Sequence, residues 1–421
     1  MALMTGNTKA AQSAGGNDLR IFVFALFFIF GGITSLNDVV IPKLKALFTL
    51  NYAEAMLVQS AFFAAYFIIS LPAAEIVKRF GYMRTAVVGL VTMTIGCLLF
   101  VPASASGQFG MFLFALFVLA AGITTVQVVA NPLISMLGNP ATAHSRLTFA
   151  QAFNSLGTTI FPYVGSILIL GSLSTVDPAK LSGAALDSFR AVETQVVEHT
   201  YLGLAAALAV VAAVVWFERK RLVEAPGEPG SIAAAFALLK RPRFGFGALC
   251  IFLYVGAEVA IGSLMVNYLM QSSVLGVAAE DAGKHVPYYW GGAMVGRFVG
   301  TYFLRVYSPG KVLACFTTAA IALLAISANS VGFISGYALL AVGLCNSIMF
   351  PTIFSLASEK LGDRTAEGSG IICMAIVGGA IVPWVTGGFA DLSHSLKFAL
   401  VVPAVCYATI LSFGWYARRP A

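Results

Sequence analysis

The sequence predicts an all-α membrane protein with twelve transmembrane helices, and its composition and apolar runs are the reasons. Only 10% of the 421 residues are charged and 59% are hydrophobic, whereas a soluble domain carries about 25% charged residues. Twelve stretches reach the roughly 20 predominantly apolar residues that a helix needs to cross the hydrocarbon core. These runs are continuously apolar, whereas membrane β-barrel strands alternate apolar and polar residues with period two.

The twelve predicted spans form two sets of six. The first set is centred near Phe28, Phe63, Val91, Phe117, Thr159 and Leu208, and the second near Phe252, Val295, Ala319, Leu340, Ile376 and Cys406. The polar stretch 218–243 lies between the sets and contains a basic run followed by Pro-Gly pairs. We therefore expect an N-terminal tail (1–18), a six-helix bundle (19–217), a cytoplasmic linker (218–243), a second six-helix bundle (244–417) and a C-terminal tail (418–421).

An internal repeat supports this division into two bundles. The segment Gly157–Val164 of the fifth span recurs as Gly378–Val385 in the eleventh, 221 residues later. The basic turn Lys78–Arg84 after the second span is echoed by Arg305–Lys311 after the eighth. The two echoes occupy matching positions in the two sets of spans.

The net charge of +7 indicates topology rather than nucleic-acid binding. If both termini are cytoplasmic, 18 of the 25 Lys and Arg residues lie in inner segments, six lie in outer segments, and Arg297 lies within a span. Cytoplasmic loops of membrane proteins carry an excess of Lys and Arg. We therefore expect both termini on the cytoplasmic side.

The cysteines point to no disulfide, metal or cofactor site. All six lie in apolar runs, without the spacing of a Cys or His metal site, and a buried thiol behaves as a small hydrophobe. The first apolar run is too long for a cleavable signal peptide. We expect no cofactor and no structural metal.

Ionisable side chains at bilayer depth cost several kcal/mol on insertion scales, which makes each a functional hypothesis. Asp38 follows Asn37 in the second half of the first span, where the alternative is a hydrated residue at the membrane surface. Glu258 and Arg297 lie in the middle of the seventh and eighth spans. We expect these two to meet, and a purely structural ion pair is the alternative. Glu75, one turn before Arg79, is expected to form a pair at headgroup level.

Side-chain amides recur in the predicted spans. An amide offers both a donor and an acceptor, which suits a neutral polyol, although any single amide could instead stabilise helix packing by less than about 1 kcal/mol. So many together favour a hydrated central cavity. Tyr288, Tyr289 and Trp290 could stack on a sugar, with an aromatic belt at the membrane surface as the alternative. The amides are Gln59, Gln127, Asn131, Gln151, Asn154, Asn267 and Asn346.

Several segments resemble the fucose/glucose/galactose permease family of the major facilitator superfamily. The resemblance covers about Phe22 to Tyr416, and its segments occur in the family's order. They are Leu36-Asn37-Asp38, Gln59–Phe63, Gln127–Pro132, Arg146–Asn154, Tyr254–Glu258, Gly296-Arg297-Phe298 and Asn346–Pro351. The resemblance implies two six-helix bundles that rock around a central site.

The resemblance also implies roles for particular residues. In the fucose-permease branch, the aspartate matching Asp38 and a glutamate matching position 127 serve proton coupling and sugar recognition. Position 127 is Gln127 here, and Glu258 stands where the fucose permease has a glutamine. This pattern resembles the glucose/galactose branch, which includes Na⁺-dependent members.

We therefore expect a secondary-active symporter that imports a neutral hexose (glucose- or galactose-like, fucose or an N-acetylhexosamine) with H⁺ or Na⁺. It would be a multi-pass monomer in the bacterial inner membrane, surrounded by lipid and binding no nucleic acid. Asp38 would carry the coupling, by protonation or by holding Na⁺ nearby, together with Glu258 and Arg297. Glu258 would also contact the sugar. The remaining expected sugar ligands are Asn37, Gln59, Gln127, Asn131, Gln151, Asn154, Asn267 and Asn346.

Three alternatives stay open at this point. They are efflux of another small molecule on a similar scaffold, a sugar sensor that does not transport, and a membrane enzyme. The sequence shows no nucleophile–base pair, metal cluster or phosphate-binding glycine loop that an enzyme would need. It also lacks the P-loop that direct coupling to ATP would require.

Overall fold

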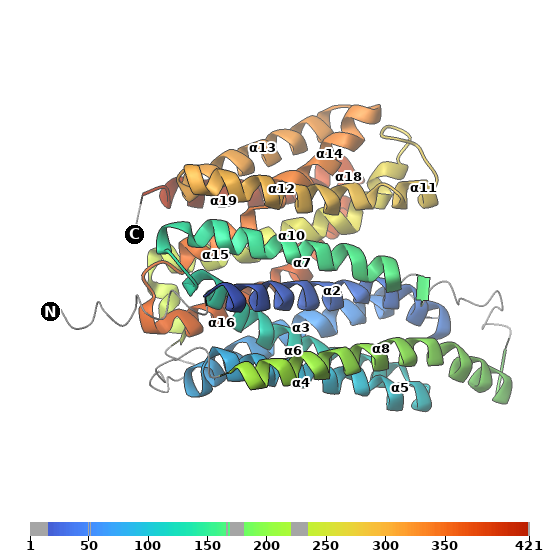
Figure 1. Cartoon of the computed structure of the whole chain (residues 1–421). Helices are drawn as coiled ribbons and strands as arrows, with labels where there is room; N and C mark the ends of the chain where they lie inside the picture. The colour runs from blue at the N-terminus through green and yellow to red at the C-terminus, as the bar shows by residue number, and fades with distance from the viewer. Residues whose placement is uncertain are drawn as a thin grey trace.

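The computed structural model describes residues 16–48, 50, 52–165, 167–168, 181–219 and 235–419. Within these ranges, some side chains lie outside the description. They are those of residues 16–18, 37–39, 41–42, 45–46, 52–56, 184, 186–187, 191 and 279–280. The described part is almost entirely helical (Figure 1). Its first half comprises α2 (Gly16–Phe48), α3 (Tyr52–Phe80), α4 (Tyr82–Leu98), α5 (Phe100–Ser106), α6 (Phe109–Met136), α7 (Ala143–Gly165) and α8 (Ala184–Glu218).

The second half follows residues 220–234, which overlap the predicted linker and lie outside the described ranges. It comprises α10 (Pro242–Met270), α11 (Ala279–Gly283), α12 (Val286–Val306), α13 (Pro309–Asn329), α14 (Gly332–Asn346), α15 (Met349–Ala357), α16 (Thr365–Ala375), α17 (Gly378–Ser393), α18 (Leu396–Ala399) and α19 (Val401–Tyr416). Short 3₁₀ turns lie at Pro140–Thr142, Ala237–Lys240 and Gly362–Arg364.

Ten helical stretches of the described residues are long and apolar enough to cross a membrane. The other two predicted spans coincide with α7 and α12, which carry more polar side chains, among them Gln151 and Arg297. The tenth and eleventh predicted spans are each divided into two helices, at residues 347–348 and 376–377. The all-helical prediction is confirmed, and its spans fall on helices.

Corresponding helix pairs pack together in the two halves. The first predicted span packs on the fifth (α2 on α7), as the seventh does on the eleventh (α10 on α17). The second packs on the fourth and the eighth on the tenth, while the third packs on the sixth and the ninth on the twelfth. The repeat seen in the sequence thus has a counterpart in helix packing.

Two glycines explain why the sequence repeat is recognisable. A Cβ atom on Gly157 would lie closer than 3.0 Å to the backbone oxygen of Phe28, and one on Gly378 would lie as close to the backbone oxygen of Phe252. Small residues at membrane-helix contacts allow backbones to approach closely. The repeated glycine is therefore the contact point of α7 on α2 and of α17 on α10.

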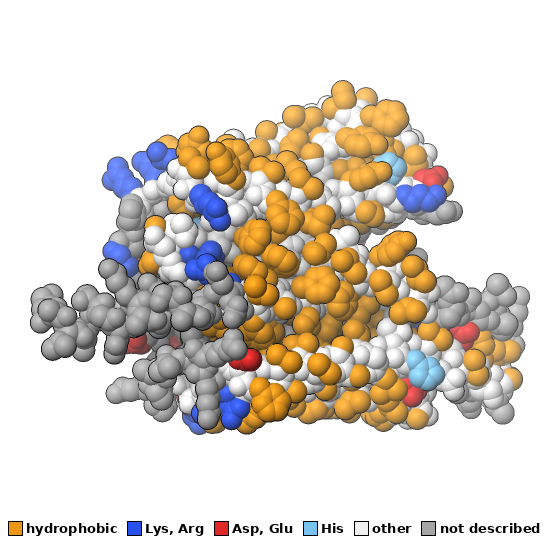
Figure 2. Space-filling model, in the orientation of Figure 1, with side chains coloured by type: hydrophobic (Ala, Val, Ile, Leu, Met, Phe, Trp, Pro, Cys, Tyr) orange, Lys and Arg blue, Asp and Glu red, His pale blue; other side chains and the backbone are white. Residues whose placement is uncertain are grey.

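The hydrogen bonds and ion pairs between the two halves, as far as the chain is described, run from the centre to one end of the molecule. This end, called the closed end below, is where α2 begins and α19 ends (Figure 1). Lys78 Nζ lies 2.6 Å from Glu367 Oε1, and Ser369 Oγ donates to the Val128 oxygen at 2.8 Å. Ser145 Oγ donates to the Thr301 oxygen at 2.9 Å. Figure 2 shows the surface hollowed near the opposite end, below α11 and α12.

Candidate functional site

A cavity lies between the two halves and is lined by both. Its empty volume, which includes space open to solvent, is about 570 Å³. The lining side chains and backbone belong to Phe30, Gly31, Thr34, Tyr66, Gln127, Gln151, Asn154, Thr158, Tyr254, Val255, Glu258, Arg297, Phe350 and Ile376.

The amides of the first half present both hydrogen-bonding functions to this cavity. Tyr66 OH donates to Gln127 Oε1 at 2.8 Å, and the NH₂ group of Gln127 makes no hydrogen bond to the described residues. Gln151 Nε2 donates to Asn131 Oδ1 at 3.4 Å, and Asn154 Nδ2 donates to the Phe27 oxygen at 3.4 Å. Their amide oxygens remain as acceptors for a ligand. A donor and two acceptors of neutral charge suit hydroxyl groups, which both donate and accept.

Glu258 brings the acidic group of the second half to the cavity. Its Oε1 accepts a hydrogen bond from Tyr254 OH, one helical turn earlier on α10, at 2.7 Å. The residue is only partly buried. The second carboxylate oxygen is therefore an acceptor for whatever enters the cavity.

Arg297 does not form the expected ion pair with Glu258, although both lie in the described part and line the same cavity. Its Nη1 donates to the backbone oxygen of Gln151 at 3.0 Å and to Ser155 Oγ, both on α7. Its Nε donates to the backbone oxygen of Ser347 at 3.3 Å, where α14 ends. Nε and Nη1 are taken by backbone and hydroxyl oxygens at the crossing of α12 with α7, so Arg297 joins the two halves. Arg297 is close enough to interact electrostatically with Glu258, but the described structure has no direct ion pair between them.

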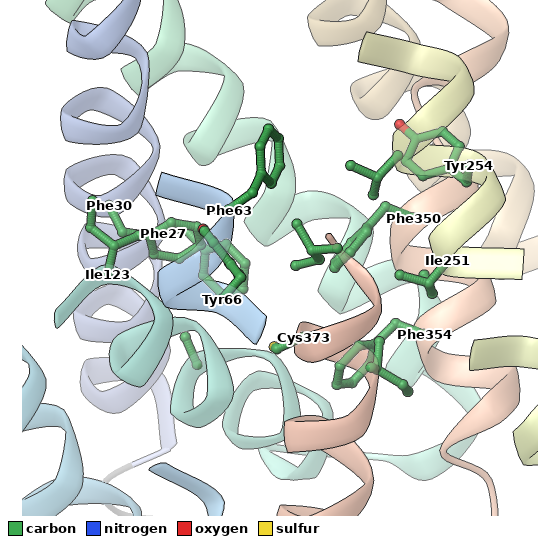
Figure 3. Close-up of a cluster of buried hydrophobic side chains, with 14 of the residues drawn as sticks. Phe27, Phe30, Phe63, Tyr66, Ile123, Ile251, Tyr254, Phe350, Phe354 and Cys373 are labelled. Atoms are coloured by element: carbon green, nitrogen blue, oxygen red, sulfur yellow. The ribbon is translucent and has the colours of Figure 1, made fainter. Parts of the chain in front are cut away.

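Aromatic side chains from both halves flank the cavity. Figure 3 shows Phe63 and Tyr66 of the first half lying opposite Tyr254 and Phe350 of the second. Tyr66, Tyr254 and Phe350 line the cavity itself, together with Phe30. Aromatic rings offer rigid apolar area with, in tyrosine, a polar end.

The predicted site residues separate into three groups. Gln127, Gln151, Asn154, Glu258 and Arg297 line the cavity, and Asn131 lies directly behind Gln151.

A second group does not line this cavity. Gln59 is half-buried on α3, Asn267 is exposed on α10, and Asn346 is fully buried inside the second half. Tyr288 and Trp290 are exposed and Tyr289 is buried, and none of the three lines the cavity. The remaining group, Asn37 and Asp38, lies outside the described side chains.

Sequence reasoning missed Thr34, Tyr66, Thr158 and Tyr254 as cavity residues. Tyr254 could have been found from its place one turn before Glu258, and Thr34 and Thr158 from polar side chains near the middle of predicted spans. One other expectation is met by the structure, because Glu75 pairs with Arg79 at 3.0 Å.

Comparison with known proteins agrees with this architecture. Residues 23–383 match the family described as Major Facilitator Superfamily. The chain is 48% identical to a glucose/galactose transporter of Brucella abortus biovar 1 (strain 9-941) over 92% of this chain and 91% of that protein. It is 33% identical to the L-fucose-proton symporter of Escherichia coli (strain K12) over 97% of this chain and 96% of that protein.

A solved structure extends the comparison to three dimensions. The transporter FucP, in a crystal structure of its outward conformation, superposes with a TM-score of 0.88 at 32% identity, covering 97% of this chain and 100% of that one. Its fold is the major facilitator fold, and the families to which these relatives belong are transporters rather than enzymes. On these grounds the chain belongs to the major facilitator superfamily, within its fucose/glucose/galactose permease family.

Proposed function

We propose that this protein is a secondary-active symporter that imports a neutral hexose, glucose- or galactose-like, fucose or an N-acetylhexosamine. The central observation is a cavity between the two halves that combines uncharged amides, aromatic faces and one hydrogen-bonded carboxylate. Such a set binds hydroxyl groups and the apolar face of a sugar ring. The names of the relatives, glucose/galactose transporter and L-fucose-proton symporter, support the same substrate class.

We infer that the structure is the outward-facing state of an alternating-access cycle. Two six-helix bundles, 19–217 and 244–417, would rock about the cavity, with the linker 218–243 and both termini in the cytoplasm of a bacterium. The closed end would then be cytoplasmic, and the hollow in Figure 2 would open outward across the inner membrane. The placement of Lys and Arg in the sequence supports this orientation.

Buried hydroxyls that lack hydrogen-bond partners at the closed end support the alternating-access proposal. The side-chain oxygens of Thr352, Ser355 and Ser358 are buried and have no hydrogen-bond partner in the described structure. All three lie on α15 or just after it, and α15 packs against α7 of the other half. Permanently buried polar groups are nearly always paired. A face that water reaches when the closed end opens would satisfy these hydroxyls in the alternate state.

For coupling, we propose that Asp38 carries the H⁺ or Na⁺ and that Glu258 contacts the sugar. Neutralising a carboxylate at bilayer depth lowers the cost of moving it through a low-dielectric environment. Arg297, which holds α7 of the opposite half, would release that helix as the halves reorient. A monomer supplies all of these groups.

The test is uptake of radiolabelled glucose, galactose, fucose and N-acetylglucosamine into proteoliposomes, with a pH gradient and a Na⁺ gradient applied separately. We expect one of these sugars to accumulate under one of the two gradients. Sugar binding without counterflow would instead indicate a sensor. Gradient-driven expulsion of amphiphiles without any sugar accumulation would indicate an efflux transporter and overturn the proposal.

A further inference from the structure

A buried hydrogen-bond network surrounds Asn346, behind the cavity wall of the second half. Asn346 Nδ2 donates to Tyr289 OH at 2.7 Å, and Tyr407 OH donates to Asn346 Oδ1 at 2.7 Å. Asn346 and Tyr407 are fully buried, and Tyr289 is 1% exposed. Both ends of the amide are therefore held by tyrosine hydroxyls, which leaves it facing protein rather than substrate.

The network reaches Glu258 by two routes. Tyr289 OH donates to the backbone oxygen of Glu258 at 3.2 Å. Tyr254 OH lies 2.7 Å from Glu258 Oε1 and 3.2 Å from the backbone oxygen of Asn346. Tyr254 has one hydroxyl proton, which the two oxygens share in a three-centre hydrogen bond whose shorter branch goes to the carboxylate. Asn346 is therefore linked to the backbone of Glu258 through Tyr289 and to the carboxylate of Glu258 through Tyr254.

Asn346 lies at a helix end, which explains why it is the centre of this hydrogen-bond network. It is the last residue of α14, and the chain makes a break at 347–348 before α15 begins. Backbone carbonyls in the last turn of a helix lack partners within that helix, and buried ones need partners elsewhere. The three tyrosines come from α10, α12 and α19, so four helices of one half meet at this amide.

We propose that Asn346, Tyr254, Tyr289 and Tyr407 form a positioning network that holds the Glu258 carboxylate toward the cavity. The proposal rests on the sugar-binding function above, and it assigns Asn346 an action through Glu258 without contact to sugar. A binding group fixed by surrounding hydrogen bonds loses less freedom when its ligand arrives. Loosening the network should therefore weaken binding only while Glu258 is present to be positioned.

The test compares Tyr407→Phe with a matched control, Tyr268→Phe. Tyr268 lies on α10, the helix of Glu258, and is 1% exposed. Its hydroxyl bonds Ser327 and Ser335, away from the network. Each change is made in the wild-type protein and in Glu258→Gln, and the Kd of purified protein for the transported sugar is measured by calorimetry together with the melting temperature.

We expect Tyr407→Phe to raise the Kd several-fold in the wild-type background and to leave it unchanged in Glu258→Gln. Tyr268→Phe should lower the melting temperature without changing the Kd in either background. An equal rise of Kd in both backgrounds would show a general packing effect and overturn the proposal, as would a Glu258→Gln variant that binds sugar like wild type.

A second measurement needs no sugar and separates this proposal from the proposed function. The infrared carboxylate band of Glu258 is isolated as the difference between wild type and Glu258→Gln. We expect this band to shift in Tyr407→Phe and to stay in place in Tyr268→Phe. Failure of the wild type to bind any hexose would refute the proposed function, whereas an unshifted band in Tyr407→Phe would refute the network.

Discussion

Glu367→Gln should open the closed end of the molecule. Glu367, on α16 of the second half, accepts from Lys78 of the first half at 2.6 Å and from Arg364 at 2.7 Å. The side chains of Lys78 and Glu367 are only 10% and 8% exposed. Neutralising Glu367 leaves Lys78 buried at the junction of the halves without this partner. Lys78 would regain water if the closed end opened.

The size of the effect follows from this burial. Removing one partner of a buried pair costs about 3–5 kcal/mol, and the residual exposure of Lys78 favours the lower figure. Because the cost falls on the closed arrangement alone, it shifts the equilibrium between closed and open ends. Each 1.4 kcal/mol is a factor of ten, so about 3 kcal/mol corresponds to a shift of roughly a hundredfold.

The assay uses Ser355→Cys as a reporter in a protein whose six native cysteines are replaced. Ser355 is buried at the closed end on α15, so maleimide labelling in detergent should be slow. We expect Glu367→Gln to raise the labelling rate at least tenfold, and Lys78→Gln/Glu367→Gln to raise it less than the single change. The control is Glu75→Gln, because Glu75 pairs with Arg79 on the same helix at 3.0 Å. Unchanged labelling in Glu367→Gln, or an equal rise in the control, would refute the reasoning.

Three further changes test the coupling residue, the sugar contacts and the helix packing. Asp38→Asn should abolish gradient-driven accumulation while sugar exchange persists, and wild-type accumulation in this variant would exclude Asp38 from coupling. Gln151→Ala and Asn154→Ala should each weaken sugar binding by about 1 kcal/mol, or roughly fivefold in Kd, whereas unchanged Kd values would make them helix contacts. Gly157→Ala should lower the melting temperature, because its Cβ would overlap the Phe28 oxygen, at a cost of about 1–3 kcal/mol. Gly203→Ala on α8, where no atom lies within 4 Å of the added Cβ, should not lower it.

The fold could be predicted because lipid imposes one strong rule. Every backbone polar group in the bilayer must be paired within the protein, so a continuously apolar run of sufficient length becomes a helix. The two least apolar spans, α7 and α12, were still identified, although they carry Gln151 and Arg297. The repeat could be read because Gly157 and Gly378 make the same close backbone contact in each half.

The cavity residues could be predicted for a related reason. A polar side chain at bilayer depth is retained where it faces protein or water, and Gln127, Gln151, Asn154 and Glu258 all line the cavity. The absence of a direct ion pair between Glu258 and Arg297 could not be predicted. The two residues lie on different helices, and their sequence positions say nothing of the rotation of α12 that directs the guanidinium to α7.

Asn346 shows the limit of predicting site residues from polarity at bilayer depth. The free-energy cost of a polar side chain at bilayer depth shows that the side chain needs a hydrogen-bond partner. It does not show whether that partner is a substrate or a neighbouring hydroxyl of the protein. That distinction depends on which side of the helix the residue occupies and on which residues face it from other helices. Tyr289 and Tyr407, distant in sequence, occupy both ends of the Asn346 amide. Tyr254 and Glu258, four residues apart on one helix, bond to each other. The same polarity therefore gives a cavity-lining carboxylate at Glu258, where one oxygen stays free, and an internal hydrogen-bond partner at Asn346, where neither end of the amide does.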